Sequence, residues 1–161
     1  MIALRLVRLI ESHSDDLSDS LIEKLFNSPR AADMRKVPKA ELRARIHEVL
    51  QHLSEWLLTK TDDEIERRYI EVGRQRAQQG VSLTDFCWTM VITKEHLWDF
   101  LQAQAFLRNP VEIYGEMELL RFMGQFFDRA LYYAAEGFEQ HLVSQAPELP
   151  SATSIASRHA H

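Results

Sequence analysis

Cysteine, glycine and proline are scarce in this sequence of 161 residues. Cys87 is the single cysteine, so no disulfide can form within the chain, which is typical of proteins kept in a reducing compartment. Five glycines and five prolines leave few sites for tight turns and helix breaks. We therefore expect long helices rather than many short strands, and an all-α fold.

Excess positive charge and long apolar runs are also missing. Basic side chains number 19 and acidic ones 24, so the formal net charge is -5 and we expect no nucleic-acid partner. No apolar run approaches the roughly 18 residues that span a bilayer. The first residues also lack the cleavage pattern of a signal peptide. These features predict a cytoplasmic protein without a membrane partner.

Motifs of catalysis and metal binding are absent from the sequence. No His follows a Glu by three residues, the arrangement that di-iron helical bundles use. His47 and His52 are five residues apart, which places them about 140° apart around a helix rather than on one face. The glycines are isolated, so no phosphate-binding loop is expected. We therefore predict no enzymatic activity, no catalytic residues and no metal site.

Capping residues and apolar periodicity predict five helices. A Thr-x-x-Glu capping box and a Gly followed by an apolar residue are the clearest start and stop signals. The expected segments are 2–27, closed by Ser28-Pro29; a helix opened by Pro38 with apolar positions as far as Leu57; Thr61 to Gly80; a helix from Ser82; and about 111–145, opened by Asn109-Pro110. We assign residues 1–145 to one domain and residues 146–161, which are rich in proline and small polar residues, to a disordered tail or linker remnant.

The last predicted helix carries two apolar stripes. Members of the first and second stripes are two residues apart, about 200° of helix rotation, so the stripes lie on nearly opposite faces. One face can pack inside the domain and the other needs a second partner. The segment 83–107 is also apolar on more than one side, so we predict a homodimer in which both helices pair as a four-helix bundle. The alternative is that both are central core helices.

We assign the first stripe to the dimer interface and the second to the domain core. Glycines and alanines on this helix are expected to permit close approach between the two chains. The interface residues of the first stripe are Met117, Leu120, Gly124, Phe127, Leu131, Ala134 and Phe138, and the stripe continues to His141; the second is Leu119, Met123, Phe126, Ala130, Tyr133 and Gly137.

Arg76 lies on the apolar stripe of its helix, which Ile65, Tyr69 and Val72 define. A buried guanidinium needs acceptors, which are either protein carboxylates and carbonyls or a bound anionic ligand. In the first case its stem packs inside and its head reaches a Glu or Asp at the edge. In the second, Arg76, Tyr69 and Val72 bind a small molecule.

The run YIEVGRQRAQQGVSL at Tyr69–Leu83, preceded by Pro38-x-x-Glu41-Leu42 and Trp56-Leu57, resembles the N-terminal sensor domain of RsbR-type stressosome co-antagonists. The resemblance covers about residues 5–143. That family is related to globin-coupled sensors, whose ligand helix carries a pattern like I-G-x-x-H-x-x-x-G-L with the His on haem iron. Arg76 takes the position of that His here, and a protonated guanidinium is not an iron ligand.

The resemblance implies a non-enzymatic, non-haem, globin-like sensor domain. It also implies dimerisation through the last two helices and a signal passed to a partner or output protein. The alternative is a haem-binding gas sensor that uses a histidine such as His96, which shares a helix row with Ile92 and Phe100. A lone His on such a row can equally be a hydrogen-bonded core residue.

Overall fold

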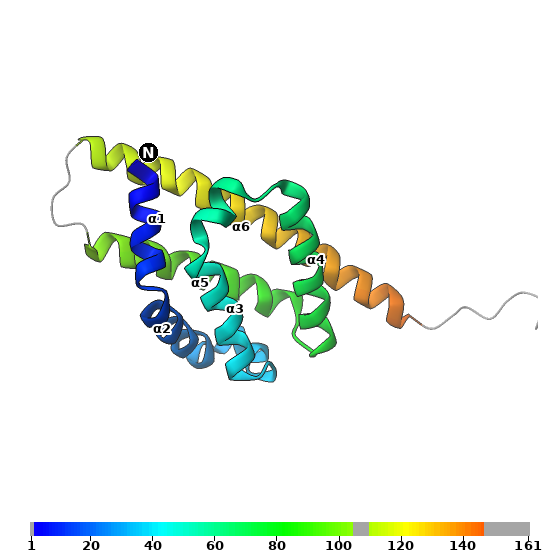
Figure 1. Cartoon of the computed structure of the whole chain (residues 1–161). Coiled ribbons are helices and arrows are strands. Elements are labelled where there is room, and N and C mark those ends of the chain that lie inside the picture. The colour runs from blue at the N-terminus through cyan, green and yellow to red at the C-terminus, as the bar shows by residue number, and fades with distance from the viewer. Residues whose placement is uncertain (1, 105–109, 147–161) are drawn as a thin grey trace, which may run out of the picture.

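The computed structural model describes residues 2–104 and 110–146, and within them it contains helices and no strand (Figure 1). The predicted all-α class is therefore confirmed. The elements in order are α1 (Ile2–Ser12), α2 (Ser14–Asn27), the 3-10 segment η1 (Pro29–Lys36), α3 (Lys39–Gln51), the π-helical turn η2 (Glu55–Thr59), α4 (Asp62–Gln78), α5 (Leu83–Gln104) and α6 (Pro110–Gln145). The predicted cap Asn109 and, apart from Ala146, the predicted tail lie outside the described residues.

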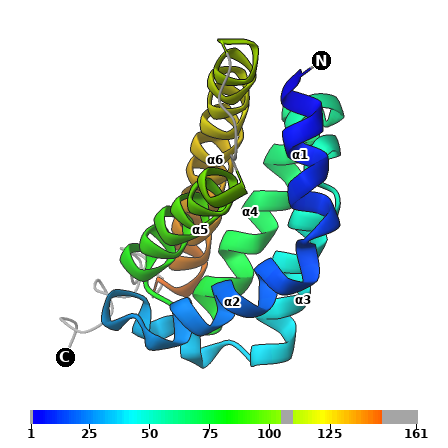
Figure 2. The ribbon, with the colours of Figure 1, turned by 90° about the vertical axis from the view of Figure 1, so that its left-hand side faces the viewer.

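The two longest helices, α5 and α6, run antiparallel to each other on one side of the molecule (Figure 1). Helices α1, α2 and α3 lie on the other side, and α4 lies between the two groups (Figure 2). Buried apolar side chains from both sides meet in two clusters, one around Trp56, Tyr69 and Phe126 and one around Phe86 and Phe138. Helix α4 thus faces the core on both flanks.

Local signals fix both ends of α4. At its start the Glu64 N–H donates to the Thr61 hydroxyl at 3.2 Å, while the Thr61 N–H donates to the Glu64 carboxylate at 2.7 Å. At its end Gly80 has φ 82°, a conformation that glycine adopts at little cost, and the Val81 N–H donates to the Arg76 carbonyl at 3.0 Å. The predicted capping box and glycine stop are both confirmed.

The first predicted helix, 2–27, is wrong as a single element because the chain bends at His13. This residue has φ -109° and ψ 19°, and it separates α1 from α2. Its Nδ1 and the Ser12 hydroxyl both hydrogen bond the Leu9 carbonyl at 2.9 Å. Side chains that bond the preceding turn in this way compete with the helical backbone, which the apolar period does not reveal.

The second predicted helix begins after Pro38 as expected but ends at Gln51. His52, with φ -114° and ψ 28°, closes α3, and the apolar positions as far as Leu57 continue into the π-helical turn η2. The start of α5 agrees with the prediction, since the Ser82 hydroxyl accepts from the Asp85 N–H at 3.2 Å.

Helix α4 crosses the C-terminal part of α6 at backbone contact distance. A Cβ atom built on Gly73 would lie 2.0 Å from the Ala134 carbonyl oxygen, and one on Gly137 would lie 2.1 Å from the Ile70 carbonyl oxygen. Ala134 and Gly137 were expected to permit close approach between two chains. That expectation is wrong for them, because their lack of bulk admits a helix of the same chain.

Candidate functional site

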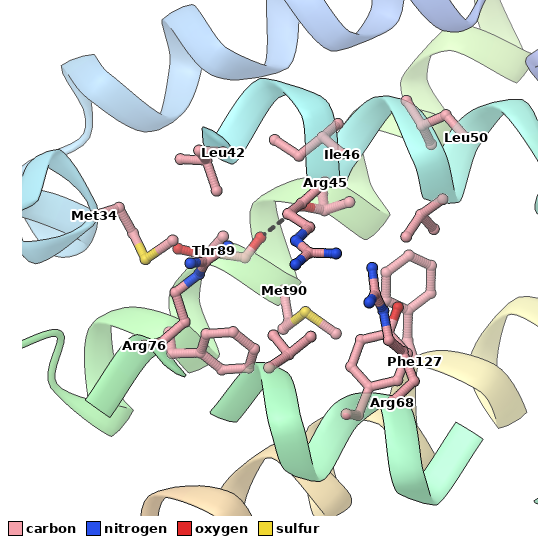
Figure 3. Close-up of a pocket in the computed structure, with 15 residues that line it drawn as sticks. Met34, Leu42, Arg45, Ile46, Leu50, Arg68, Arg76, Thr89, Met90 and Phe127 are labelled. Carbon is pink, nitrogen blue, oxygen red and sulfur yellow. Dashed lines mark hydrogen bonds between the residues drawn. The ribbon is translucent and has the colours of Figure 1, made fainter. Parts of the chain in front are cut away.

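A cavity of about 90 Å³ lies between α3, α4, α5 and α6, with Met34 of η1 at one side (Figure 3). Tyr69, Val72 and Arg76, the three residues predicted to bind a ligand, all line it. The other lining residues are mainly apolar: Met34, Leu42, Ile46, Val49, Leu50, Phe86, Met90 and Phe127, with Thr89, Thr93, Arg45 and Arg68. The structure thus brings the predicted site residues to one hollow, and their role in binding stays a prediction.

The Arg76 side chain is only 2% exposed, yet its charge is paired. Its Nη1 donates to Glu41 Oε1 at 2.9 Å and to Gln79 Oε1 at 2.8 Å. The Gln79 amide in turn donates to both Glu41 oxygens at 3.2 Å. The Glu41 side chain is 37% exposed, so the pair joins the core to the surface. This is the arrangement expected when the head of a buried arginine reaches an acid at the edge.

This pairing changes the chemistry of Glu41. The hydrogen bond from Arg76 is the largest cause that lowers the pKa of Glu41, and Gln79 adds to it. The carboxylate is therefore ionised at neutral pH and neutralises Arg76. Glu41 comes from the helix that follows Pro38, 35 residues before Arg76, so no local pattern identified it as the partner.

Tyr69 is buried beside the cavity, with 7% of its surface exposed. Its ring makes edge contacts with Trp56 and Phe126, at centroid distances of 5.9 and 5.7 Å. Burial raises the pKa of the phenol well above its usual value, so the hydroxyl keeps its proton and can donate. This hydroxyl makes no hydrogen bond to the residues that the structure describes, and it is not among the fully buried polar atoms that lack a partner.

Two further guanidinium groups, those of Arg45 on α3 and Arg68 on α4, point into the space between the helices (Figure 3). Arg68 forms an ion pair with Glu48. Sequence reasoning missed Arg45 because basic residues at positions 43 and 45 of a helix are usually solvated. A signal was available, since Arg45 lies one helical turn after Leu42 and next to Ile46, both on the apolar face.

His96, the alternative haem ligand, lies away from this cavity. It is 9% exposed and lines a groove between α2 and α5. Its Nε2 lies 2.7 Å from the Ser20 hydroxyl, and its Nδ1 has no partner among the described residues. Burial and, less strongly, the charge of Lys24 lower the pKa of His96. Within the described residues no three His, Cys, Asp or Glu side chains are grouped as a metal site.

The residues predicted at the dimer interface divide into two sets. Met117 is 65% exposed and Leu120 is 50% exposed, while Gly124 and Leu131 are partly exposed. In contrast, α4 and the core bury three members of the stripe in the single chain: Phe127, Ala134 and Phe138. These three have no surface left to offer, so only the first part of the stripe and Leu131 remain candidates for contact with a second chain.

Over residues 2–104 and 110–146, no helix combines the length and apolar composition that crossing a bilayer requires. Large apolar side chains are instead exposed in a short stretch at the start of α6: Val111, Ile113, Tyr114, Met117 and Leu120.

Comparison with known proteins identifies one family. The profile of the RsbT co-antagonist protein rsbRD N-terminal domain matches residues 15–148, which include all of the cavity described above. No curated protein and no solved structure matches the chain. The match agrees with the resemblance seen around Arg76 and covers most of the sequence. The chain belongs to the RsbT co-antagonist N-terminal domain family, whose members are regulatory domains of stressosome signalling.

Proposed function

We propose that this chain is a non-enzymatic, cytoplasmic sensor domain that forms a homodimer and passes a signal to a partner or output protein. The observation that carries this proposal is the exposed apolar stretch at the start of α6, which ends at Met117 and Leu120. Contiguous exposed apolar side chains of this kind usually mark a protein interface. The family's name describes a co-antagonist of RsbT, so we expect the partner to be a component of that signalling assembly.

The proposed dimer joins α5 and α6 of two chains into a four-helix bundle. Exposed Met117 and Leu120 and half-buried Trp98 provide the apolar surface on these two helices. Burial of apolar surface is the main favourable contribution to most protein association, so a patch of this kind is a suitable contact for a symmetric pair. Gly124 lies next to the patch and has open space where a side chain would project.

Gly124 provides a clean test of this interface. A Cβ atom there would meet nothing within 4 Å, so the single chain has room where the side chain of Gly124→Leu begins. We expect wild type to have the mass of a dimer in light scattering and Gly124→Leu to shift towards the monomer. Leu142→Gln, at another exposed position of α6, serves as the control and should keep the dimer mass. An unchanged mass for Gly124→Leu would contradict the proposed interface.

The ligand site of this sensor is the cavity lined by Tyr69, Val72 and Arg76, and we propose that it works without haem. Arg76 occupies the position of the iron-binding His in the related sensors, and none of the described residues that line the cavity is a His or a Cys. Its volume of about 90 Å³ is below the roughly 300 Å³ at which pockets for drug-sized ligands begin. An absorbance titration with haem tests this. A flat Soret region is expected, whereas a band that saturates at one haem per chain and disappears in His96→Ala would support the gas-sensor alternative.

A further inference from the structure

Of the arginines that line the cavity between α3, α4, α5 and α6, one has no acid among the described residues that neutralises it. Three guanidinium groups line it, and no carboxylate is among its described lining residues. Glu48 neutralises Arg68, and Glu41 neutralises Arg76. Arg45 is half-buried and forms no hydrogen bond or ion pair with any described residue. Its guanidinium group is therefore available to an anion in the cavity.

Glu41 does not remove this availability. Arg76 is the largest cause of the lowered pKa of Glu41, and Arg45 adds only a smaller contribution through space. The oxygens of Glu41 are already occupied by Arg76 and Gln79. Glu41 already accepts hydrogen bonds from two other side chains, so the half-buried Arg45 guanidinium is stabilised most by a separate hydrogen-bond acceptor.

The hydroxyl of Tyr69 is a second group without a partner. Tyr69 is more than nine-tenths buried, lines the same cavity and stays protonated, yet its hydroxyl has no hydrogen bond to the described residues. Among the described residues, the buried polar atoms without a partner are His96 Nδ1 and Glu118 Oε1, so the Tyr69 oxygen is not closed off and a molecule in the cavity can reach it. A ligand oxygen would accept from this hydroxyl and from Arg45.

The remaining walls and the volume limit what such an anion can be. The apolar side chains around the cavity cannot replace the hydration shell of a phosphate or sulfate dianion, but they do suit a short hydrocarbon tail. One water molecule occupies about 30 Å³ in the liquid. A cavity of about 90 Å³ therefore holds roughly three groups of similar size, such as a carboxylate, a methylene and a methyl group. One excess positive charge matches one negative charge.

We propose that this cavity binds a small monocarboxylate with a short apolar tail, of the size of propionate or butyrate. The carboxylate accepts from the Arg45 guanidinium, whose planar fork fits two carboxylate oxygens, and from the Tyr69 hydroxyl. The tail lies among Ile46, Val49 and Met90, which line the cavity. The inference rests on the proposed function in taking this cavity as the ligand site, and it adds the ligand class and Arg45.

Titration calorimetry on the whole chain tests this with butyrate, its neutral analogue butyramide, and octanoate. Butyrate should bind at least about tenfold more tightly than butyramide, because a charge-assisted pair is replaced by neutral hydrogen bonds. Octanoate should bind more weakly because its tail exceeds the cavity. Equal affinity for butyrate and butyramide would overturn the role of charge, and tighter binding of octanoate would show that the site takes longer acyl chains instead.

Three variants separate the contribution of each group. Arg45→Gln should weaken butyrate binding about tenfold and remove the preference over butyramide. Arg43→Gln, two positions away on the same helix, loses only surface ion pairs with Asp15 and Asp19 and should bind butyrate as wild type does. Tyr69→Phe keeps the ring contacts and should weaken binding severalfold. Unchanged butyrate affinity in Arg45→Gln would refute the proposal.

Failure of this inference can be told from failure of the proposed function. If butyrate does not bind at millimolar concentration but Gly124→Leu still converts a dimer to a monomer, the carboxylate site is wrong and the dimeric signalling domain stands. If butyrate binds with the expected selectivity to a chain that is monomeric at every concentration, the site stands and the dimer is wrong.

Discussion

The crossing of α4 and α6 predicts that Gly73→Ala destabilises the protein. The added Cβ would lie 2.0 Å from the Ala134 carbonyl oxygen and 2.7 Å from its carbonyl carbon, whereas ordinary contacts begin near 3.4 Å. The two helices would have to separate by about 1.4 Å, since backbone atoms cannot rotate aside as a side chain can. Overpacking of this kind costs about 1–3 kcal/mol and sometimes more, and the better helix propensity of alanine returns at most about 1 kcal/mol.

Because a contact of 2.0 Å places the cost at the upper end of that range, we expect the free energy of unfolding to fall by about 2 kcal/mol. For a chain of this length that corresponds to a fall of roughly 4–8 °C in Tm. Urea unfolding followed by circular dichroism measures the change, provided that the slope of the transition stays constant.

Gly124→Ala is the matched control for this measurement. Gly124 lies in α6, the longer of the two crossing helices, but a Cβ atom built on it would meet nothing within 4 Å. Because Gly124 lies beside the proposed dimer interface, the comparison is made at a protein concentration where the chain is monomeric. There helix propensity predicts a gain of about 0.5–1 kcal/mol in the free energy of unfolding. The two substitutions are chemically identical, but they should change the free energy of unfolding in opposite directions. If Gly73→Ala is as stable as Gly124→Ala, the close approach of the two backbones is refuted.

Three further substitutions test the cap, the buried pair and the buried histidine. Thr61→Ala removes the acceptor for the Glu64 N–H and should lower the free energy of unfolding by about 1 kcal/mol in urea titration. Glu41→Gln should lower the Tm at pH 7, because Arg76 loses its carboxylate partner. The pKa of Glu41 is lowered in the folded chain, so the stability that its carboxylate contributes is present above a pH of about 4 and is lost in more acid solution. The difference in Tm between wild type and Glu41→Gln should therefore shrink towards pH 3. The pKa of His96 is also lowered in the folded chain, so the His96 imidazole takes up a proton more readily when the chain is unfolded. Wild type should therefore lose stability as the pH falls below about 6.5. In a series of thermal melts over the same pH range, His96→Gln should lose less stability than wild type.

Local chemistry in the sequence predicted the helix ends well. The Thr61 capping box, the Gly80 stop and the Pro38 and Ser82 starts each depend on groups no more than five residues apart, so the local sequence is enough to predict them. The break at His13 was missed although it too is local. Its cause is a hydrogen bond from an imidazole to the turn before it, and that competes with the helix without disturbing the apolar period.

Long-range packing was predicted less well, because periodicity reports which residues avoid water but not what covers them. The stripe assigned to the dimer interface is one continuous pattern in sequence, yet α4 covers Ala134 and Phe138 packs against Phe86 of α5, while Met117 stays exposed. The pairing of Arg76 with an acid was among the expected outcomes, but the identity of Glu41 follows from the packing of α3 against α4. For Arg45 the helix period already places it beside Leu42 and Ile46 on the apolar face of α3, but the residues of α4 and α5 that complete the cavity around it follow only from the packing.

The position of the α4 crossing along α6 has a mechanical consequence. Helix α6 has 36 residues, and its C-terminal turns project past α4 (Figure 1). From Ala134 about 36 Å of helix extend back to Pro110 and about 16 Å extend forward to Gln145, at 1.5 Å per residue. With the backbones in direct contact at Ala134, the crossing is a fulcrum that divides α6 into a long and a short arm. A tilt that moves the Pro110 end by 2 Å would therefore move the Gln145 end by about 1 Å in the opposite direction.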